Sequence, residues 1–327
     1  DGEVVGHLFA CFFKTLAMLR YGIMPIWVFD GTPPSIKQDT IDDRKKLKEI
    51  AHSKLNDMEN LDVDERYKLE KRTFSISTKQ IAEIKLLLNY LGVNFINAPG
   101  EAEAQCSALN IADVCNGVVT EDWDAVLFGC KKMLKDFSNK SMVMEVNVDK
   151  LLQKLEITQE QLIDLCSILG NDYCSGIGGI KPIEAYKKFK KVNYNMQDFL
   201  ENLKKENKIK FRYRISETFE RDWKSSREYY LHAPVFKPEI IDVNWKEPQY
   251  DKIYDYLVID KNFKEDIIKN KINELKLMYK YYIINNNNLI TLSRINKELN
   301  FVMNKSKSFP RFNINHNNIF RVSSIIT

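Results

Sequence analysis

The stretch "VVTEDWDAVLFG", residues 118–129, bears on the fold and on the site at once. Its apolar opening predicts a buried strand, and "DAVLFG" predicts a short helix directly after it. Between the two, Glu121, Asp122 and Asp124 place three acids within four positions. A carboxylate is costly to remove from water unless a positive group lies against it. The stretch therefore predicts a strand end where carboxylates meet a metal ion, a basic side chain or water.

Outside this stretch, predicted strands alternate with predicted helices. The runs "MPIWVFDG" (24–31) and "VNFINAPG" (93–100) read as strands, and "EAEAQCSALNIADVC" (101–115) returns as a helix. Such alternation predicts an α/β fold with a doubly wound, mainly parallel sheet, whose ligands gather beyond the carboxyl ends of the strands. Further strands are predicted at 131–137 and 141–147, and further helices at 4–21, 77–92, 149–155 and 158–170.

The composition limits the classes of protein to consider. The chain has 327 residues, 44% hydrophobic and 29% charged, which suffices for one large core or a core with a satellite domain. No apolar run reaches the roughly 18 to 20 residues needed to cross a bilayer, so no membrane partner is expected. The start, "DGEVVGHLFACFF", lacks the features of a secretory signal. Six cysteines without a CxxC pair indicate reduced thiols and an intracellular protein.

Charge is distributed unevenly, although the net charge is only +4. From Lys181 to Arg214, eleven basic residues stand against four acids. This block suits a polyanionic substrate held near bound cations, and a solvated helix face is the alternative. Residues 37–72 are also highly charged and predict exposed helices that stand away from the core. After about residue 280, Asn-rich runs such as "IINNNNLI" indicate a mobile tail or insert.

Acidic residues recur where predicted elements end. Mg²⁺ takes hard oxygen ligands, and two such ions about 4 Å apart can clamp the attacking and leaving oxygens of a phosphodiester. For any single acid, a surface position or a helix N-cap is the alternative. Because the carboxyl ends of parallel strands meet at one edge, the whole set favours a metal site. The candidate ligands are Asp30, Glu101, Glu103, Asp122, Asp124 and Asp172.

Several motifs, taken in order, resemble the XPG-type family of structure-specific 5′ nucleases, and its flap endonuclease branch in particular. They are "VFDGTPPSIK", "APGEAEAQCSAL", "TEDWDAVLFG", "LCSILGNDYCSGIGGIKP" and "VNWKEP", and the resemblance extends to about residue 277. It implies that the six acids hold two Mg²⁺ ions, for which Mn²⁺ can substitute. It also implies that the chain hydrolyses flapped or branched DNA at single-strand/duplex junctions, in replication and repair.

The resemblance assigns roles to basic residues as well. The family places a helical arch at about 35–80, through which a single-stranded 5′ end passes, and Lys37 and Arg44 match its two residues that contact the scissile phosphate. These two residues lie two helical turns apart, so both can face one groove. The family's helix–turn–helix matches "YCSGIGGIKPIEAYKKFKK" and implies contacts to the duplex backbone and a K⁺ ion. The DNA-binding candidates are Gly176, Gly178, Gly179, Lys187, Lys188, Lys190 and Lys191.

The resemblance also divides the chain into three parts. Residues 1–172 would form the nuclease core, without the N-terminal part of the family domain, and 173–277 the helix–turn–helix with the C-terminal part of that domain. Residues 278–327 would be an Asn-rich extension. The family's first core strand, which carries a seventh metal-binding Asp, is expected upstream of residue 1. The C-terminal sequence does not support binding to a sliding clamp, and a monomer is expected.

Alternative functions stay open at this point. A 5′ exonuclease or a junction-resolving nuclease of the same family would differ in its products, and a catalytically silent DNA-binding relative would lack only the chemistry. A metal-dependent sugar transferase could use a DxD pair but has no need of an arch or a helix–turn–helix. The expected location is the nucleus or a site of viral DNA replication, depending on the source.

Overall fold

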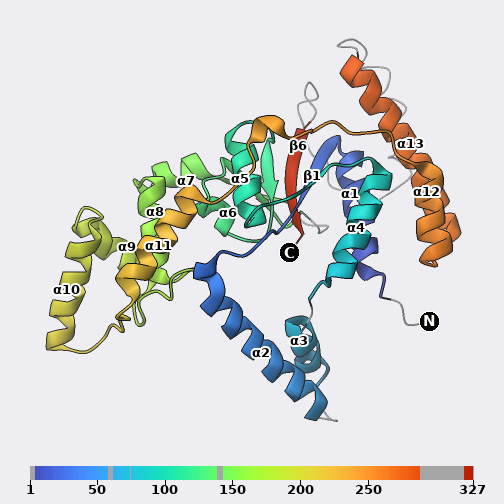
Figure 1. Ribbon diagram of the computed structural model, residues 1–327. Coiled ribbons are helices and arrows are strands. Elements are labelled where there is room, and N and C mark those ends of the chain that lie inside the picture. The colour runs from blue at the N-terminus through green and yellow to red at the C-terminus, as the bar shows by residue number, and fades with distance from the viewer. Residues whose placement is uncertain (1–3, 58–61, 74, 138–142, 288–319, 327) are drawn as a thin grey trace.

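The computed structural model describes residues 4–57, 62–73, 75–137, 143–287 and 320–326. The strands are β1 (Ile23–Phe29), β2 (Phe95–Asn97), β3 (Gly117–Val119), β4 (Lys132–Lys135), β5 (Met144–Asn147) and β6 (Phe320–Ile326). They form one sheet in the order β2-β1-β6-β3-β4-β5, in which β5 alone of these strands runs antiparallel to its neighbour. Helices cover both faces of this sheet (Figure 1), so the predicted α/β fold is confirmed.

The helices follow the strands in the alternation that the sequence predicted. Before and within the sheet lie α1 (Gly6–Arg20), α2 (Gln38–Asp57), α3 (Val63–Thr73), α4 (Thr78–Leu91), α5 (Ala102–Ile111), α6 (Asp124–Leu127) and α7 (Val148–Leu155). They are followed along the chain, before β6, by α8 (Gln159–Leu169), α9 (Pro182–Lys191), α10 (Met196–Ile209), α11 (Phe219–His232), α12 (Tyr250–Tyr254) and α13 (Glu265–Asn287). Three short turns of other helix types are η1 (Ser35–Lys37), η2 (Pro238–Ile240) and η3 (Asp255–Asp260). No helix among the described residues combines the length and the apolar character needed to span a membrane.

Strand β1 shows how the sheet is buried on both sides. All of its residues are buried, as expected of a strand inside a parallel sheet. Trp27 and Phe29 belong to the core that includes α1, α4 and α13, whereas Ile26 and Val28 belong to the core that includes α5 and α6. This split follows from the alternation of side chains along a strand. The Trp27 indole also donates a hydrogen bond to the Thr15 hydroxyl, at 3.1 Å.

Strand β6 lies in the middle of the sheet although it is the last element of the chain (Figure 1). It pairs in parallel with all of β1 on one side and with β3 on the other. Because β1 and β3 do not pair with each other, β6 joins the two halves of the sheet. The sequence patterns predicted no strand in this extension. The predicted mobile tail falls largely on 288–319, outside the described residues.

Helix ends follow local signals in the sequence. Ser77 and Gln80 form a capping box at the start of α4, and Thr158 and Gln161 form another at the start of α8. Gly92 ends α4 in the left-handed region with φ of 68°, where a Cβ would lie 2.1 Å from a backbone oxygen of the 245–247 segment. The predicted helices 77–92 and 158–170 are confirmed.

Helices α2 and α3 extend away from the sheet (Figure 1), as their charge predicted. Ala51 and Leu69 are the buried side chains among the described residues of this pair. A separate small core lies beside the sheet, where α9, α10 and the chain near Tyr213 pack on the end of α8. These two projections flank the carboxyl edge of the sheet, where the candidate site lies.

Candidate metal centre

The carboxyl ends of β1 and β2 bring two acidic segments together. The strands pair in parallel up to their last residues, so the chain leaves both at the same edge. Asp30 follows β1, and the loop after β2 leads to Glu101 at the start of α5. The Gly31 amide donates to the Gly100 carbonyl at 2.8 Å. A Cβ at Gly31 would lie 2.0 Å from the Ala98 oxygen, so this close approach requires glycine.

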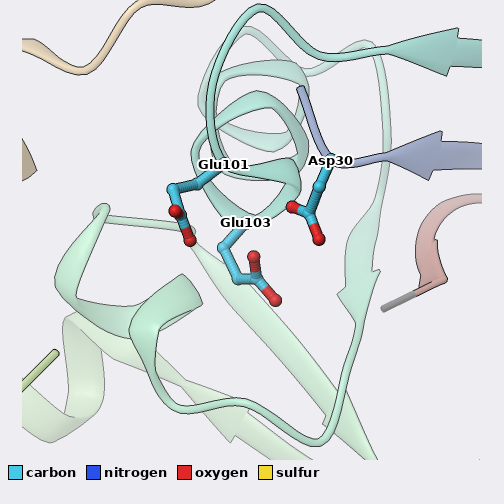
Figure 2. A group of neighbouring side chains, drawn as sticks. All are labelled: Asp30, Glu101 and Glu103. Atoms are coloured by element: carbon cyan, nitrogen blue, oxygen red, sulfur yellow. The ribbon is translucent and has the colours of Figure 1, made fainter. Parts of the chain in front are cut away.

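Asp30, Glu101 and Glu103 form a compact carboxylate cluster. One ligand oxygen from each lies within 4.8 Å of the others, and Figure 2 shows the three side chains converging from the end of β1 and the first turn of α5. Asp30 accepts a hydrogen bond from the Ala102 amide at 2.8 Å, which fixes its carboxyl at the start of the helix. Glu103 is only 3% exposed, and its Oε1 has no hydrogen-bond partner among the described residues.

The other candidate ligands lie beside this cluster. The charge of Asp122 acts on Asp30 and Glu103, and that of Asp172 acts on Glu101 and Asp124. Asp122 Oδ1 accepts a hydrogen bond from the Asp124 amide at 3.0 Å, so the turn before α6 holds this pair. The structure thus brings three of the predicted acids into tight contact and places the remaining three around them.

Glu121, the third acid of the opening stretch, has a different environment. Its Oε1 accepts a hydrogen bond from the Asp136 amide at 2.9 Å, and its Oε2 lies 3.9 Å from Lys135 Nζ. The acids of "TEDWD" (120–124) therefore lie in two different environments. Asp122 and Asp124 belong to the carboxylate site, whereas Glu121 meets a basic side chain and the backbone.

Lys37 and Arg44 reach the carboxylates from η1 and α2. Lys37 Nζ lies 2.8 Å from Glu101 Oε2 and 3.1 Å from Asp172 Oδ2, and its side chain is 13% exposed. Arg44 Nη2 lies 2.6 Å from Asp172 Oδ1, while its side chain remains 61% exposed. Thr40, between them, donates its hydroxyl to the Asp172 carbonyl at 2.7 Å. Both predicted basic residues therefore contact the same carboxylate.

The pKa values of four carboxyl groups of the site are raised above their ordinary values. Burial, and then the charge of Asp30, raises the pKa of Glu103 to about 8. Burial, and then the charges of Asp122 and Asp172, raises the pKa of Asp124 to about 7. Burial also raises the pKa of Asp30 and of Glu101, against the opposing effect of Lys37.

Burial and the neighbouring carboxylates act on the pKa of Lys37 in opposite directions. Burial by itself lowers the pKa of its ammonium, but the hydrogen bonds and charges of Glu101 and Asp172 outweigh burial and raise it. The lysine is thus held as a cation among carboxylates that carry more negative charge than it can neutralise.

The residues present fit hard divalent cations. Every candidate donor is a carboxylate oxygen, which is the ligand type that Mg²⁺ and Mn²⁺ prefer. Glu103 Oε1 has no hydrogen-bond partner among the described residues, and burial together with neighbouring acids raises the pKa values of Glu103 and Asp124, so a bound cation would be favourable here. Asp30, Glu101 and Glu103 would hold one ion, and the Asp122–Asp124 pair with Asp172 extends the site beside it.

The predicted glycine loop packs against the protein's own backbone. Gly176 and Gly179 have φ of 73° and 89°, and a Cβ on Gly179 would lie 2.4 Å from the Arg212 oxygen. The Gly178 amide and carbonyl exchange hydrogen bonds with Arg214, both at 2.9 Å. Close packing within the chain therefore accounts for these glycines, and their contact with phosphate or K⁺ stays a prediction.

The predicted DNA-binding lysines fall into two groups. Lys187 and Lys191 are exposed on α9. Lys188 Nζ lies 2.5 Å from a Glu206 carboxylate oxygen, and Lys190 Nζ lies 2.6 Å from one of Glu156. Lys187 and Lys191 are therefore available to a phosphate without the loss of an ion pair to another described residue, whereas Lys188 and Lys190 would have to exchange partners.

Three tyrosines of the site were not predicted as functional residues. Tyr173 follows Asp172 directly, and Tyr229 and Tyr230 come from α11. Their rings pack together, with centroids 4.9 Å apart for Tyr173 and Tyr229 and 5.1 Å apart for Tyr173 and Tyr230. The adjacent pair in "EYYLH" was the available signal, but only the tertiary structure shows that α11 carries it to the acids.

A mainly parallel sheet with carboxylates at its carboxyl edge, contacted by a lysine just before a projecting helix and an arginine on that helix, is the arrangement of XPG-type nucleases. The chain matches the XPG N-terminal domain over residues 3–54 and the XPG I-region over residues 92–172. Among solved structures it resembles flap endonuclease-1 from Methanococcus jannaschii, with a TM-score of 0.64 and 26% identity, over 86% of this chain and 84% of that one.

Two relatives identify the family within the class of XPG-type nucleases. Flap endonuclease 1 of Caenorhabditis elegans is 35% identical over 283 residues, which cover 84% of this chain and 72% of the relative. Flap endonuclease 1 of Tetrahymena thermophila is 33% identical over 279 residues, with the same two coverages. The chain belongs to the flap endonuclease family, as the motifs predicted.

Proposed function

We propose that the chain is a structure-specific 5′ flap endonuclease that hydrolyses a DNA phosphodiester at a single-strand/duplex junction with two divalent ions. The observation that carries the proposal is the convergence of Asp30, Glu101 and Glu103 beneath Lys37 and Arg44. Membership of the flap endonuclease family supports the choice of substrate. Its place would be DNA replication and repair, in the nucleus or at a site of viral DNA replication.

The carboxylates would bind Mg²⁺, or Mn²⁺ in its place. Bound ions would supply an activated water and neutralise charge on the reacting phosphate. Asp30 is already oriented by its hydrogen bond from the Ala102 amide, so its carboxyl needs little rearrangement. Glu103 must lose its proton, because its pKa of about 8 leaves it mostly neutral at pH 7.

Lys37 and Arg44 would exchange partners during the reaction. Both side chains contact carboxylates that are candidate ligands. With cations bound to those carboxylates, Lys37 and Arg44 would be free to contact the scissile phosphate. Arginine's fork matches phosphate oxygens, and a lysine adds a compact positive charge, so both would stabilise negative charge that develops there.

The duplex would lie on the basic block around α9 and α10. Lys187 and Lys191 are exposed there and would contact the backbone without reading sequence. A K⁺ ion at the 176–179 loop is part of this proposal. The free 5′ strand would pass along the α2–α3 pair, whose side chains are mostly exposed and charged.

The test is cleavage of a 5′-flap duplex labelled at the flap end. We expect one short labelled product in Mg²⁺ and none in excess chelator. A gapped duplex and a four-way junction run in parallel distinguish flap cleavage from exonuclease and junction-resolving activity by product length. Tight junction binding without cleavage in Mg²⁺ would instead identify a silent DNA-binding relative.

Variants locate the chemistry at the predicted site. Asp122→Asn with Asp124→Asn should abolish cleavage, and full activity of this double variant would contradict the proposal. Lys37→Ala should slow single-turnover cleavage about 100-fold or more while leaving flap binding within a few-fold. Lys46→Ala is the matched control, because this lysine lies exposed on α2, the helix that follows Lys37, and pairs only with Asp43 among the described residues.

A further inference from the structure

Three tyrosine hydroxyls are buried beside the carboxylates of the site. The hydroxyls of Tyr173, Tyr229 and Tyr230 are buried and make no well-formed hydrogen bond to any described residue, and the same holds for Glu103 Oε1. Buried polar atoms in native proteins nearly always have a partner, and a group of them at one place indicates a missing one. Their shared location points to a ligand of the carboxylate site.

Each hydroxyl lies near a different part of that site. Tyr230 is 4% exposed, and its hydroxyl is close enough to the Asp124 carboxyl to affect it, although the contact falls short of a full hydrogen bond. The Tyr229 hydroxyl stands near the Glu101 backbone amide, against Gly100, where a Cβ would lie 3.2 Å from it. Tyr173 lies under Lys37, with Nζ 5.8 Å from the ring centroid.

Packing explains the rings but not the hydroxyls. Tyr173 packs against the rings of Tyr229 and Tyr230, and Phe128 packs against the same two rings, with centroids 4.8 Å from Tyr230 and 6.0 Å from Tyr229. Phenylalanine would make the same ring contacts without burying an unpaired oxygen. A phenolic hydroxyl is neutral at pH 7 and can both donate and accept a hydrogen bond.

We propose that Tyr229 and Tyr230 are positioning residues of the metal centre, whose hydroxyls donate hydrogen bonds to the ligand carboxylates and to the water ligands of a bound divalent ion, while Tyr173 fixes the two rings. Mg²⁺ keeps several of its waters when protein carboxylates bind it, so donors and acceptors around the direct ligands are needed. Such outer partners orient the ligands, and their loss typically weakens metal binding about 10- to 100-fold. The inference rests on the proposed function, because it requires the carboxylates to bind metal.

The test separates a role in metal binding from a role in packing. Tyr229→Phe, Tyr230→Phe and the double variant keep every ring and remove only hydroxyl groups. Chelator-treated proteins are titrated with Mn²⁺ in the absence of DNA, by calorimetry and by the electron paramagnetic resonance signal of free Mn²⁺, and their metal-free melting temperatures are recorded. Tyr194→Phe is the matched control, because its hydroxyl is likewise buried without a full hydrogen bond but lies beside Tyr186, away from the acids.

We expect each single variant to bind Mn²⁺ about 10-fold more weakly than wild type, and the double variant more weakly still. Metal-free melting temperatures should be equal to or above that of wild type, because an unpaired buried oxygen has been removed. Variants that bind Mn²⁺ within two-fold of wild type would overturn the inference, and so would an equal loss in Tyr194→Phe. Wild-type protein that binds no Mn²⁺ would instead refute the proposed function, so the two failures are distinguishable.

Discussion

Binding of a divalent ion to this chain should release protons, in an amount that the carboxyl pKa values determine. Glu103 has a pKa of about 8 and Asp124 a pKa of about 7, both raised chiefly by burial. A carboxyl group must lose its proton to bind metal. At pH 7 about nine tenths of the Glu103 side chains and about half of the Asp124 side chains are protonated, given those pKa values.

When the whole site fills, the expected release is therefore at least about 1.4 protons per chain at pH 7. It should fall to about 0.1 at pH 9, where both groups are already ionised. The raised pKa values of Asp30 and Glu101 add to the release at lower pH. The sign is fixed: because the metal-bound state holds fewer protons, acidification from pH 8 must weaken metal binding.

Calorimetry measures this quantity directly. Mn²⁺ is titrated into chelator-treated protein at one pH in buffers with different heats of ionisation, and the slope of the observed heat against that heat gives the protons released. Glu103→Gln should lower the release at pH 7 to about 0.5, because only the Asp124 contribution remains.

Glu121→Gln is the matched control, since Glu121 lies in the same stretch but interacts with Lys135 and the backbone. It should leave the release unchanged. Equal heats in all buffers at pH 7, or an unchanged slope in Glu103→Gln, would show that Glu103 does not bind metal from a protonated state.

Other predictions concern stability. In chelator, the free energy of unfolding should fall as pH rises from 5 to 8, because the folded Glu103 carboxyl binds its proton up to about pH 8 whereas an unfolded one releases it near the ordinary value of 4.5. The Glu103 contribution to this loss is at most about 5 kcal/mol and is absent in Glu103→Gln, in which the smaller fall due to Asp124 remains. A denaturation midpoint that rises over this range, or an equal fall in Glu103→Gln, would disprove the prediction. Removal of residues 288–327 should lower the melting temperature by about 10 °C or more, because β6 joins β1 to β3, and circular dichroism of a deletion variant that melts like the full chain would argue against this pairing. Gly92→Ala should cost about 2 kcal/mol or more in urea denaturation, because its Cβ would meet the Lys246 oxygen at 2.1 Å, whereas Gly6→Ala, with open space around it, should cost nothing measurable.

Local sequence predicted the elements of this fold because their signals lie within a few residues. Apolar runs and helical spacing placed the strands from β1 to β5 and the helices between them. The acids after β1, β2 and β3 could be read as one site, because parallel strands end at a common edge. The exposure of α2 and α3 followed from their charge alone.

Contacts between distant segments were decided only in three dimensions. No local pattern shows that β6 enters the sheet beside β1, which lies nearly the whole chain away, because pairing partners are chosen by packing rather than by a strand's own residues. The same holds for Lys37, which bridges Glu101 and Asp172, and for the Tyr229 and Tyr230 hydroxyls that α11 carries to the acids. Sequence by itself therefore determined which side chains could bind metal. The tertiary structure determined which of them are desolvated together. Desolvation raises their pKa values and makes a bound cation favourable there.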